Sequence, residues 1–527
     1  MDENPYAPSL VPKLKSRLAK RGNSPILKWI APKLKKSQAF SKSVYVVQLS
    51  ADAEIGTPKY DRVEEQLSEK GARIIEKHSN RFEDTLIVDT DNNGIGNIEL
   101  LRSINGVDIV YPRPIPKALG MTKQLKNGLT GDINDVGDAC SKSETRNQAS
   151  ILDHITAPFA NIKNRGEGVH IVVWDFLPKD RQKFAQNPDM LNRAGGPPTI
   201  YDDETASEDM HGGAVCSTCC GSGVGLAPAS KLSIIGLTSS VTGDLSIIDE
   251  ICKDANGGAV IVNMSFALEF QNVKQEDIPD AKKSMDTLTA AMDTLKALHP
   301  KLVFVVAAGN ESLNPCDTKG PVSFSGCNDC LMWPQSRYGE AYGWKDVPFV
   351  LVGATDAAKN QGGDREIASF SNFGKCVHVF AHGSPVCSLD TSKGGDYVAI
   401  AGTSFSSPLF ASMLALYFSA KPESTADQAV GYMIENAEKG TIKFTQDSKD
   451  SLNRFAIVPT ELNAGKIKKT PITSFLESGV EKGNIHTIMT LLLIIFAVFF
   501  VFYIFRKRST DKQKNIIKNT RRAPGTF

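Results

Sequence analysis

Four polar side chains in this sequence have the chemical types that nucleophilic acyl transfer requires. A serine hydroxyl is a weak nucleophile at neutral pH, so it needs a base, and that base needs a partner that fixes its tautomer. The tetrahedral oxyanion needs a preorganised donor, which a side-chain amide can supply. We therefore predict a nucleophile, a base, an orienting acid and an oxyanion donor: Ser404 in "AGTSFSSPLFASML", His211 opening "HGGAV", Asp175 closing "VHIVVWD" and Asn310 closing "VFVVAAGN".

Each of these residues also has a purely structural interpretation. Thr403 or Ser404 could cap a helix that has Pro408 in its first turn. An Asp after a strand or an Asn after a Gly often forms a turn, and a His before glycines often has only a packing role. Taken one at a time, the structural interpretations are favoured. The occurrence of Asp, His, Asn and Ser together, in this order and in these surroundings, favours joint chemistry.

The elements that must hold these side chains can be read from apolar runs that begin after about residue 166. The runs are "VHIVVW", "LSIIGL", "AVIVNM", "LVFVVAA" and "FVLVGA". Strands that are apolar on both faces suit a parallel sheet covered on both sides. Helical segments such as "LSIIDEICKDA" and "AKKSMDTLTAAMDTLKAL" lie between the runs. This alternation predicts a doubly wound α/β domain with a mainly parallel sheet, whose site lies beyond the carboxyl ends of the strands.

A smaller unit precedes this domain. Strand patterns in "SVYVVQL", "RIIEKH", "DTLIVDT" and "VDIVYPRP" are joined by helical patterns in "YDRVEEQLSEKGA" and "NIELLRSI". The resulting order, β-α-β-β-α-β, predicts a small ferredoxin-like α+β domain. The stretch "GLTGDINDVGDACSKSETRNQAS" is rich in Gly, Asp and Ser and predicts an exposed linker.

Composition excludes some classes of function. The 527 residues are too many for one ordinary domain, and the hydrophobic content of 41% is typical of globular proteins. The formal net charge of +1 argues against nucleic acid as the main partner.

One segment near the C-terminus has the character of a membrane anchor. From Ile488 to Phe505 the chain reads "IMTLLLIIFAVFFVFYIF" without a charge, and the uncharged run from Ile485 is long enough for one transmembrane helix in a lipid bilayer. A buried core helix is disfavoured because the stretch is apolar on every side. We therefore expect a single-pass membrane protein.

Two topology signals of this anchor conflict. Residues 506–527 carry eight Lys or Arg, which would keep this tail in the cytosol and place the large domain in a lumen or outside the cell. The N-terminal residues contain no apolar core long enough for a signal peptide, which favours a cytosolic domain. We expect the lumenal or extracellular placement.

The quoted segments resemble those of subtilisin-like serine proteases, the subtilases, over about residues 44–460. "GTSFSSP" matches the family's nucleophile motif Gly-Thr-Ser-x-Ser/Ala-x-Pro, and "HGGAV" resembles its histidine motif with Gly213 in place of the usual threonine. "VVAAGN" matches the strand that ends in the oxyanion-hole asparagine, and "GLAPASKL" resembles the family's Gly-Val-Ala-Pro turn. The order Asp, His, Ser along the chain is that of subtilisin.

This resemblance implies a serine-type endopeptidase that acts on protein or peptide substrates through a triad of Asp175, His211 and Ser404. Asn310 and the backbone N–H of Ser404 would bind the oxyanion. No cofactor and no metal is implied for the chemistry. Structural calcium is common in the family, but no calcium ligand cluster can be read from this sequence.

The resemblance also implies how substrate and inhibitor bind. "IVNMSFA" resembles the family strand that pairs with the substrate backbone, which assigns substrate binding to Ser265, Phe266 and Ala267. The small N-terminal domain, with "LRSINGVDIVYP" near its end, resembles the inhibitory propeptide. The chain would then be made as a zymogen whose own propeptide is an intramolecular inhibitor.

These expectations divide the chain into seven segments. The predicted segments are a basic flexible extension (1–43), an inhibitory propeptide-like domain (44–117), a linker (118–160), a subtilisin-like catalytic domain (161–460), a juxtamembrane linker (461–484), a transmembrane helix (485–505) and a basic tail (506–527).

The segment around Asp175 departs from the family. Subtilases usually have Asp-Ser/Thr-Gly there, whereas this chain has Asp175-Phe176-Leu177. Asp180 is the other carboxylate nearby. The departure leaves open a catalytically inactive subtilase fold that serves as a membrane-tethered binding module. An esterase of the α/β-hydrolase class is disfavoured, because its Gly-x-Ser-x-Gly elbow is absent at Ser404.

The ten cysteines leave the redox state open. "CSTCC" and "CNDC" each contain Cys-x-x-Cys, but a zinc site would need two such pairs brought together. In the subtilase interpretation the first group packs on the helix after His211. If the domain lies outside the cytosol, Cys316 could pair with Cys327 or Cys330.

Overall fold

The computed structural model describes a little over half of the chain. The described residues are 27–28, 44–80, 82–90, 98–118, 164–201, 209–238, 240–270, 278–315, 322–324, 327–335, 347–356, 365–390, 397–459 and 462. Within these ranges no helix has the length and apolar character that crossing a bilayer requires. The predicted transmembrane helix, 485–505, and the basic tail after it lie outside the described residues.

The small N-terminal domain has its elements in the predicted β-α-β-β-α-β order. They are β2 (Val44–Leu49), α2 (Pro58–Glu69), β3 (Arg73–Ser79), β4 (Asp84–Asp89), α3 (Ile98–Arg102) and β5 (Val107–Pro112). The sheet order is β1-β3-β4-β2-β5, with every pair antiparallel. Strand β1 (Leu27–Lys28) comes from the predicted flexible extension, so part of that extension is structured.

The main domain is built on a nine-stranded sheet in the order β20-β22-β17-β15-β12-β10-β7-β9-β8. Its strands are β7 (His170–Asp175), β8 (Thr199–Tyr201), β9 (Lys231–Gly236), β10 (Val260–Met264), β12 (Leu302–Ala307), β15 (Phe349–Asp356), β17 (Val379–Ser384), β20 (Glu438–Lys439) and β22 (Arg454–Phe455). Neighbours from β8 to β22 run parallel, and β20 is antiparallel to β22. The sheet is therefore mainly parallel, as predicted.

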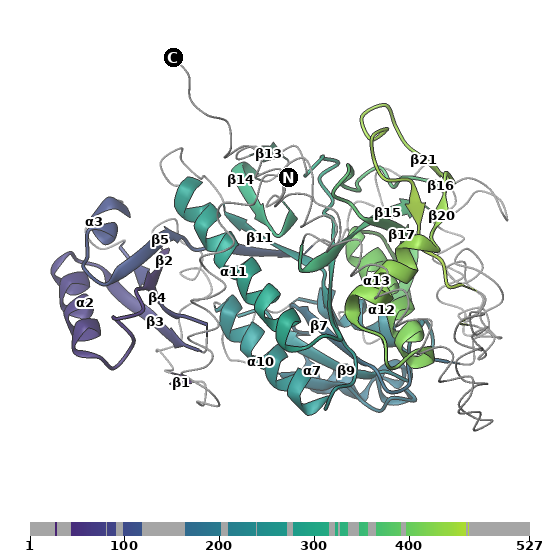
Figure 1. Ribbon diagram of the computed structural model, residues 1–527, viewed down its shortest axis with the longest axis horizontal. Coiled ribbons are helices and arrows are strands. Elements are labelled where there is room, and N and C mark those ends of the chain that lie inside the picture. Colours follow the sequence, from purple (N-terminus) through teal and green to yellow (C-terminus); the bar gives the residue numbers. More distant parts are fainter. Residues whose placement is uncertain are drawn as a thin grey trace, which may run out of the picture. The chain divides into compact units, whose positions relative to one another are not determined.

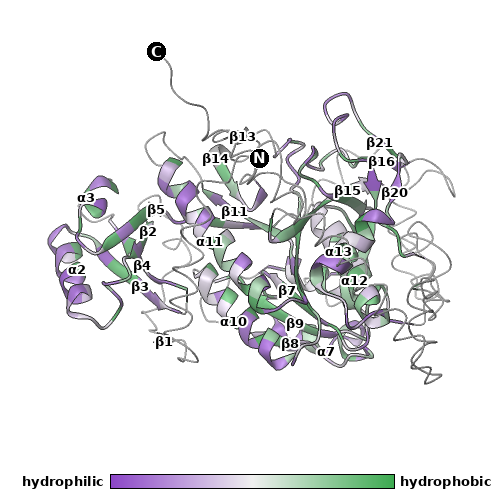
Figure 2. Cartoon of the chain, viewed as in Figure 1, coloured by the Kyte–Doolittle hydropathy of each residue, from purple (hydrophilic) through white to green (hydrophobic). Residues whose placement is uncertain are grey.

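Side chains alternate between the two faces of this sheet and build two cores. Along β7, Ile171 and Val173 face one core, whereas Val172 and Trp174 face the other. The first core is covered by α9 (His211–Cys220), α12 (Thr403–Ala420) and α13 (Ala426–Glu435), and the second by α10 (Val241–Asp254) and α11 (Ile278–Leu298) (Figure 1). Because both faces are covered, the central strands are mostly apolar on both faces, as their green colour shows in Figure 2.

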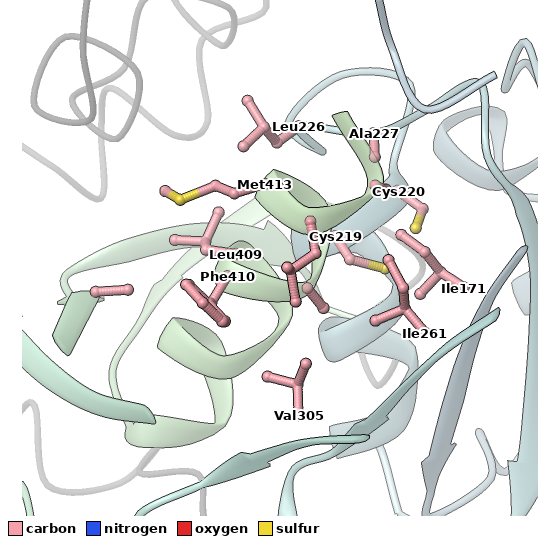
Figure 3. Close-up of a cluster of buried hydrophobic side chains, with 14 of the residues drawn as sticks. Ile171, Cys219, Cys220, Leu226, Ala227, Ile261, Val305, Leu409, Phe410 and Met413 are labelled. Atoms are coloured by element: carbon pink, nitrogen blue, oxygen red, sulfur yellow. The ribbon is translucent and has the colours of Figure 1, made fainter. Parts of the chain in front are cut away.

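Helices α9 and α12 pack against each other over the sheet. Figure 3 shows Cys219 and Cys220 of α9 in one apolar cluster with Leu409 and Met413 of α12 and with strand residues such as Ile171. Every residue of α12 from Thr403 to Phe418 is buried, including its serines. Ser412 Oγ donates to the carbonyl oxygen of Cys219 at 3.0 Å. Small polar side chains thus allow this helix to pack closely against α9.

The direction of winding reverses at β7. The chain passes from β7 through α9 to β9 on one side, whereas β10, which follows α10, lies on the other side of β7. Ligands of such sheets bind beyond the carboxyl ends of the strands at this switch point. The loops after β7, β10 and β12 are therefore the place to examine for a site.

Smaller elements complete the main domain. A four-stranded sheet has the order β13-β14-β11-β6. The remaining elements are α7 (Arg181–Gln186), α8 (Pro188–Leu191), β6 (Ile115–Ala118), β11 (Phe266–Phe270), β13 (Val322–Phe324), β14 (Cys327–Trp333), β16 (Arg365–Glu366), β18 (Val386–Leu389), β19 (Tyr397–Ile400) and β21 (Ile442–Lys443).

Candidate active site

The carboxyl end of β7 and the first turn of α9 bring Asp175 and His211 into contact. Asp175 Oδ1 lies 2.8 Å from His211 Nδ1. The Asp175 side chain is 0% exposed and that of His211 is 6% exposed. Burial raises the pKa of Asp175, whereas the charge and hydrogen bond of His211 and the backbone N–H of Phe176 lower it. The pair has the geometry in which a carboxylate orients an imidazole.

Gly212 explains why α9 can begin so close to β7. A Cβ atom at this position would lie 2.0 Å from the backbone carbonyl oxygen of Phe176. Neither backbone could relieve such an overlap without moving His211 away from Asp175. The glycine at position 212 therefore lets α9 start close to the sheet for a direct steric reason.

The unusual residues after Asp175 have structural partners. The backbone N–H of Phe176 donates to Asp175 Oδ1 at 2.7 Å, and the Phe176 ring meets the His211 ring edge-on at 6.3 Å between centroids. Leu177 is buried in the first core. Asp180, the other nearby carboxylate, caps α7 by accepting from the backbone N–H of Lys183 at 2.8 Å. The structure thus places Asp175, and not Asp180, against His211.

Ser404 is the second residue of α12. The helix follows Gly402, whose φ of 151° and ψ of 157° are essentially restricted to glycine, and no side chain caps it. The structural interpretation in which Thr403 or Ser404 caps the helix is therefore wrong. Pro408 also lies beyond the first turn, because the helix starts at Thr403.

Ser404 and Ser265 are joined by two reciprocal hydrogen bonds. Ser404 Oγ donates to the carbonyl oxygen of Ser265 at 3.1 Å, and Ser265 Oγ donates to the carbonyl oxygen of Ser404 at 2.9 Å. Pro408 lacks the N–H that would otherwise bond the Ser404 carbonyl within the helix. The hydroxyl of Ser265 satisfies that carbonyl instead. The nucleophile candidate is thereby fixed to the loop that follows β10.

The imidazole of His211 lies near the start of α12. The rings of His211 and Phe405, the residue after Ser404, are 6.0 Å apart between centroids. His211 Nε2 is buried without a hydrogen-bond partner among the described residues. Hydrogen bonds between catalytic groups are often long in free enzymes and tighten only when substrate binds. His211 Nε2 is therefore available to take a proton from a neighbouring hydroxyl.

Asn310 follows β12 and contacts the same helix start. Its Oδ1 atom accepts from both the backbone N–H and the hydroxyl of Thr403, each at 2.9 Å. The hydroxyl of Thr403 in turn accepts from the backbone N–H of Gly309 at 3.1 Å. Because Oδ1 is engaged as an acceptor, Nδ2 is the atom of this side chain that can donate to an oxyanion.

The predicted substrate-binding residues lie at and just before β11. Ser265 directly precedes the strand, and Phe266 and Ala267 are its first residues; all three are buried. Strand β11 is antiparallel to β14 on one side and to β6 on the other. In the second pair Ala118 faces Phe266 and Lys117 faces Ala267. The sequence analysis missed β6, which follows the N-terminal domain directly.

The cysteines of α9 are structural. Cys216, Cys219 and Cys220 are buried and free, and burial raises the pKa of the Cys216 and Cys219 thiols. Cys376 and Cys387, which the sequence analysis did not single out, are each in a disulfide. Among the described residues no three His, Cys, Asp or Glu side chains gather as metal ligands do. The side chains of Cys316, Cys327 and Cys330 lie outside the described set.

A model of the subtilase family matches residues 91–456. Alkaline serine exoprotease A of Vibrio alginolyticus is 26% identical over 275 residues, which are 51% of this chain and 42% of the relative. Subtilase-type proteinase psp3 of Schizosaccharomyces pombe is 28% identical over 267 residues, 48% of this chain and 49% of the relative. The chain thus spans about half the length of these curated relatives.

Two solved structures share the fold. Fervidolysin from Fervidobacterium pennivorans, a keratinolytic enzyme related to subtilisin, has a TM-score of 0.51 at 14% identity, over 84% of this chain and 65% of that one. The epidermin leader peptide processing serine protease of Staphylococcus aureus also has a TM-score of 0.51, at 15% identity, over 81% of this chain and 99% of that one. At these identities the likeness concerns the fold.

Proposed function

Because this chain belongs to the subtilase family, we propose that it is a serine endopeptidase that hydrolyses peptide bonds of protein or peptide substrates. The observation that carries the proposal is the buried contact of 2.8 Å between Asp175 and His211, next to the start of α12, whose second residue is Ser404. Of the curated relatives named above, one is a serine exoprotease and the other a subtilase-type proteinase, which agrees with this chemistry.

The proposed mechanism assigns one step to each group. Ser404 Oγ attacks the scissile carbonyl carbon while His211 Nε2 takes its proton, and the imidazolium then returns that proton to the leaving amine. Asp175 holds the imidazole through Nδ1 and stabilises its charged form. Asn310 Nδ2 and the backbone N–H of Ser404 donate to the oxyanion. Water then attacks the acyl-enzyme with His211 again acting as base.

We also propose that the chain is made as a zymogen in which the propeptide-like domain, residues 44–117, inhibits the site. In support, β6 covers the edge of β11, the strand assigned to the substrate, and thus pairs as an extended peptide would. The small domain also contacts α10: Thr242 Oγ1 donates to Glu83 Oε1 and accepts from Asn80 Nδ2, each at 2.9 Å. Glu83 places a carboxylate near the N-terminus of that helix, where the helix dipole favours negative charge.

Self-cleavage tests the protease and zymogen proposals together. The full-length protein should cut itself just after β6, because that strand lies on the substrate edge of β11 and leads toward Ser404. The Ser404→Ala variant should stay intact. Intact mass measured over time follows both proteins. Cleavage that proceeds equally in the variant would overturn the proposal and favour the catalytically inactive binding module.

The membrane tether is a further part of the proposal. The uncharged run 485–505 would span the bilayer once, with the basic tail in the cytosol and the catalytic domain on the lumenal or extracellular side. Disulfides at Cys376 and Cys387 agree with an oxidising compartment. Full-length protein should resist alkaline carbonate extraction, whereas a chain ending at residue 484 should be released. Release of both would contradict the tether.

A further inference from the structure

Two buried carboxylates come from the proposed substrate strand and from the loop that holds Asn310. Glu269 is on β11 and Glu311 follows Asn310, and their side chains are 4% and 3% exposed. Burial raises the pKa of Glu311; Lys117 and Asn372 lower it, and the neighbouring Glu269 raises it further. Two buried like charges are costly unless a cation accompanies them.

In the structure a side chain of β6 supplies that cation. Lys117 Nζ lies 2.7 Å from Glu269 Oε1 and 3.4 Å from Glu311 Oε1. Lys117 faces Ala267 in the β6–β11 pair, so Glu269, two residues further along β11, is its diagonal neighbour on the same face. The ion pairs therefore follow from the register of an extended peptide on this edge.

The position of the Glu311 carboxylate is fixed independently of Lys117. Asn372 Nδ2 donates to Glu311 Oε2 at 2.8 Å and to the carbonyl oxygen of Ala308 at 2.9 Å. Gly309, with φ of 109°, leaves the room for this contact, since a Cβ there would lie 2.2 Å from Asn372 Nδ2. The Glu311 carboxylate is thus held on the same loop as the oxyanion residue Asn310.

The register also relates Lys117 to the reacting bond. Ala118 faces Phe266, so the next residue of a peptide bound like β6 would face Ser265. The carbonyl oxygen of Ser265 is the acceptor of the Ser404 hydroxyl. A peptide residue facing Ser265 is therefore the one whose carbonyl Ser404 can attack. Lys117 marks the position two residues before it, the third residue on the N-terminal side of the scissile bond.

We propose that Glu269 and Glu311 form a cation-selective subsite that makes the enzyme prefer substrates with Lys or Arg at the third residue N-terminal to the scissile bond. The inference rests on the proposed protease function. When the cleaved propeptide dissociates and β6 separates from β11, Glu269 and Glu311 lose the ammonium group of Lys117. A basic substrate side chain replaces it, and a neutral one leaves the two carboxylates without that partner.

The test uses processed enzyme made from the full-length chain and fluorogenic peptides Ile-Pro-X-Ala-Leu, where X is Lys, Arg, norleucine or Glu. Removing the ammonium group that accompanies two buried carboxylates is costly, so kcat/KM should be roughly 10- to 100-fold higher for Lys than for norleucine. The Glu269→Gln, Glu311→Gln double variant should bring the Lys-to-norleucine ratio close to one. Glu423→Gln removes an exposed carboxylate elsewhere and should leave the ratio as in wild type.

A wild-type ratio close to one, with the norleucine peptide cut by wild type and not by Ser404→Ala, would overturn this inference and leave the protease proposal standing. An undiminished ratio in the double variant would overturn it as well.

If no peptide is cut, the protease proposal fails, and thermal unfolding of the intact Ser404→Ala chain decides about the subsite. Lys117→Met should then lower Tm more than Lys283→Met, a control that breaks only the exposed ion pair with Asp108. In a chain that also carries Glu269→Gln and Glu311→Gln, the Tm shifts caused by Lys117→Met and Lys283→Met should become nearly equal. Equal Tm shifts would overturn the cation-selective subsite.

Discussion

Replacing Asp175 with Asn is expected to lower kcat for peptide hydrolysis about 10⁴-fold, the order of loss typical when only the orienting acid of a triad is removed. Asp175 Oδ1 accepts the Nδ1 hydrogen bond of His211, which leaves Nε2 free to take a proton. The side-chain amide of Asn can instead donate an N–H to Nδ1, which stabilises the tautomer of His211 that carries its proton on Nε2 and cannot act as the base. Because Asn has nearly the same size as Asp, the fold should be retained. Steady-state kinetics and thermal unfolding of the variant measure the two effects.

Asp180→Asn is the matched control for this substitution. Asp180 caps α7, and Asn caps a helix about as well as Asp does. Its kcat should therefore stay near that of wild type. A full loss of activity in Asp180→Asn, with activity retained in Asp175→Asn, would contradict the assignment of the orienting carboxylate.

Replacing Asn310 with Ala is expected to lower kcat about 10²- to 10³-fold with a small change in KM. The loss appears in kcat because the Nδ2 donor acts on charge that develops only in the transition state. Alanine also removes the acceptor of the two Thr403 hydrogen bonds. A lower thermal stability of this variant is therefore expected beside the kinetic effect.

Asn310→Asp separates the two roles of the side chain. Aspartate keeps oxygen acceptors for Thr403 but has no N–H to donate, and its charge opposes an oxyanion. Its kcat should fall at least as far as that of Asn310→Ala, although its unfolding temperature stays closer to wild type. Wild-type kcat in Asn310→Asp would rule out Asn310 as the oxyanion donor.

The central sheet could be predicted from the sequence because its strands are apolar on both faces. "LVFVVAA" corresponds to β12 and "AVIVNM" to β10, each within one residue at either end. Such runs reflect burial between two layers of helices, which is a local property of the sequence. The β-α-β-β-α-β order of the small domain could be read for a related reason, since its alternating strands and amphipathic helix patterns are also local.

Strand β6 could not be predicted, because its pairing with β11 depends on tertiary structure. Pro114 and Pro116 indicate the end of a strand, and the sequence analysis placed that end at β5. β6 is the edge strand of its sheet, where a proline is tolerated because one side of the strand needs no ladder hydrogen bonds. Edge strands that form only against a distant partner leave little signal in their own sequence.

Only part of the candidate site could be predicted from the sequence. Asp175 ends β7, His211 and Ser404 lie in the first turns of α9 and α12, and Asn310 lies in the loop after β12, so their order and surroundings were visible. The acidic pair was not, because Glu269 and Glu311 come from separate loops and strands and have no motif spacing. The reciprocal bonds of Ser265 and Ser404 likewise depend on the carbonyl that Pro408 leaves unbonded, which only the structure reveals.

The central claim is that Ser404 is an activated nucleophile. The measurement that tests it most directly is labelling of the self-processed full-length protein with a fluorophosphonate probe, followed by mass spectrometry of the labelled peptide. The account predicts a label on Ser404 that is absent from Ser404→Ala and from heat-unfolded protein. No label on folded, processed wild-type protein would contradict it.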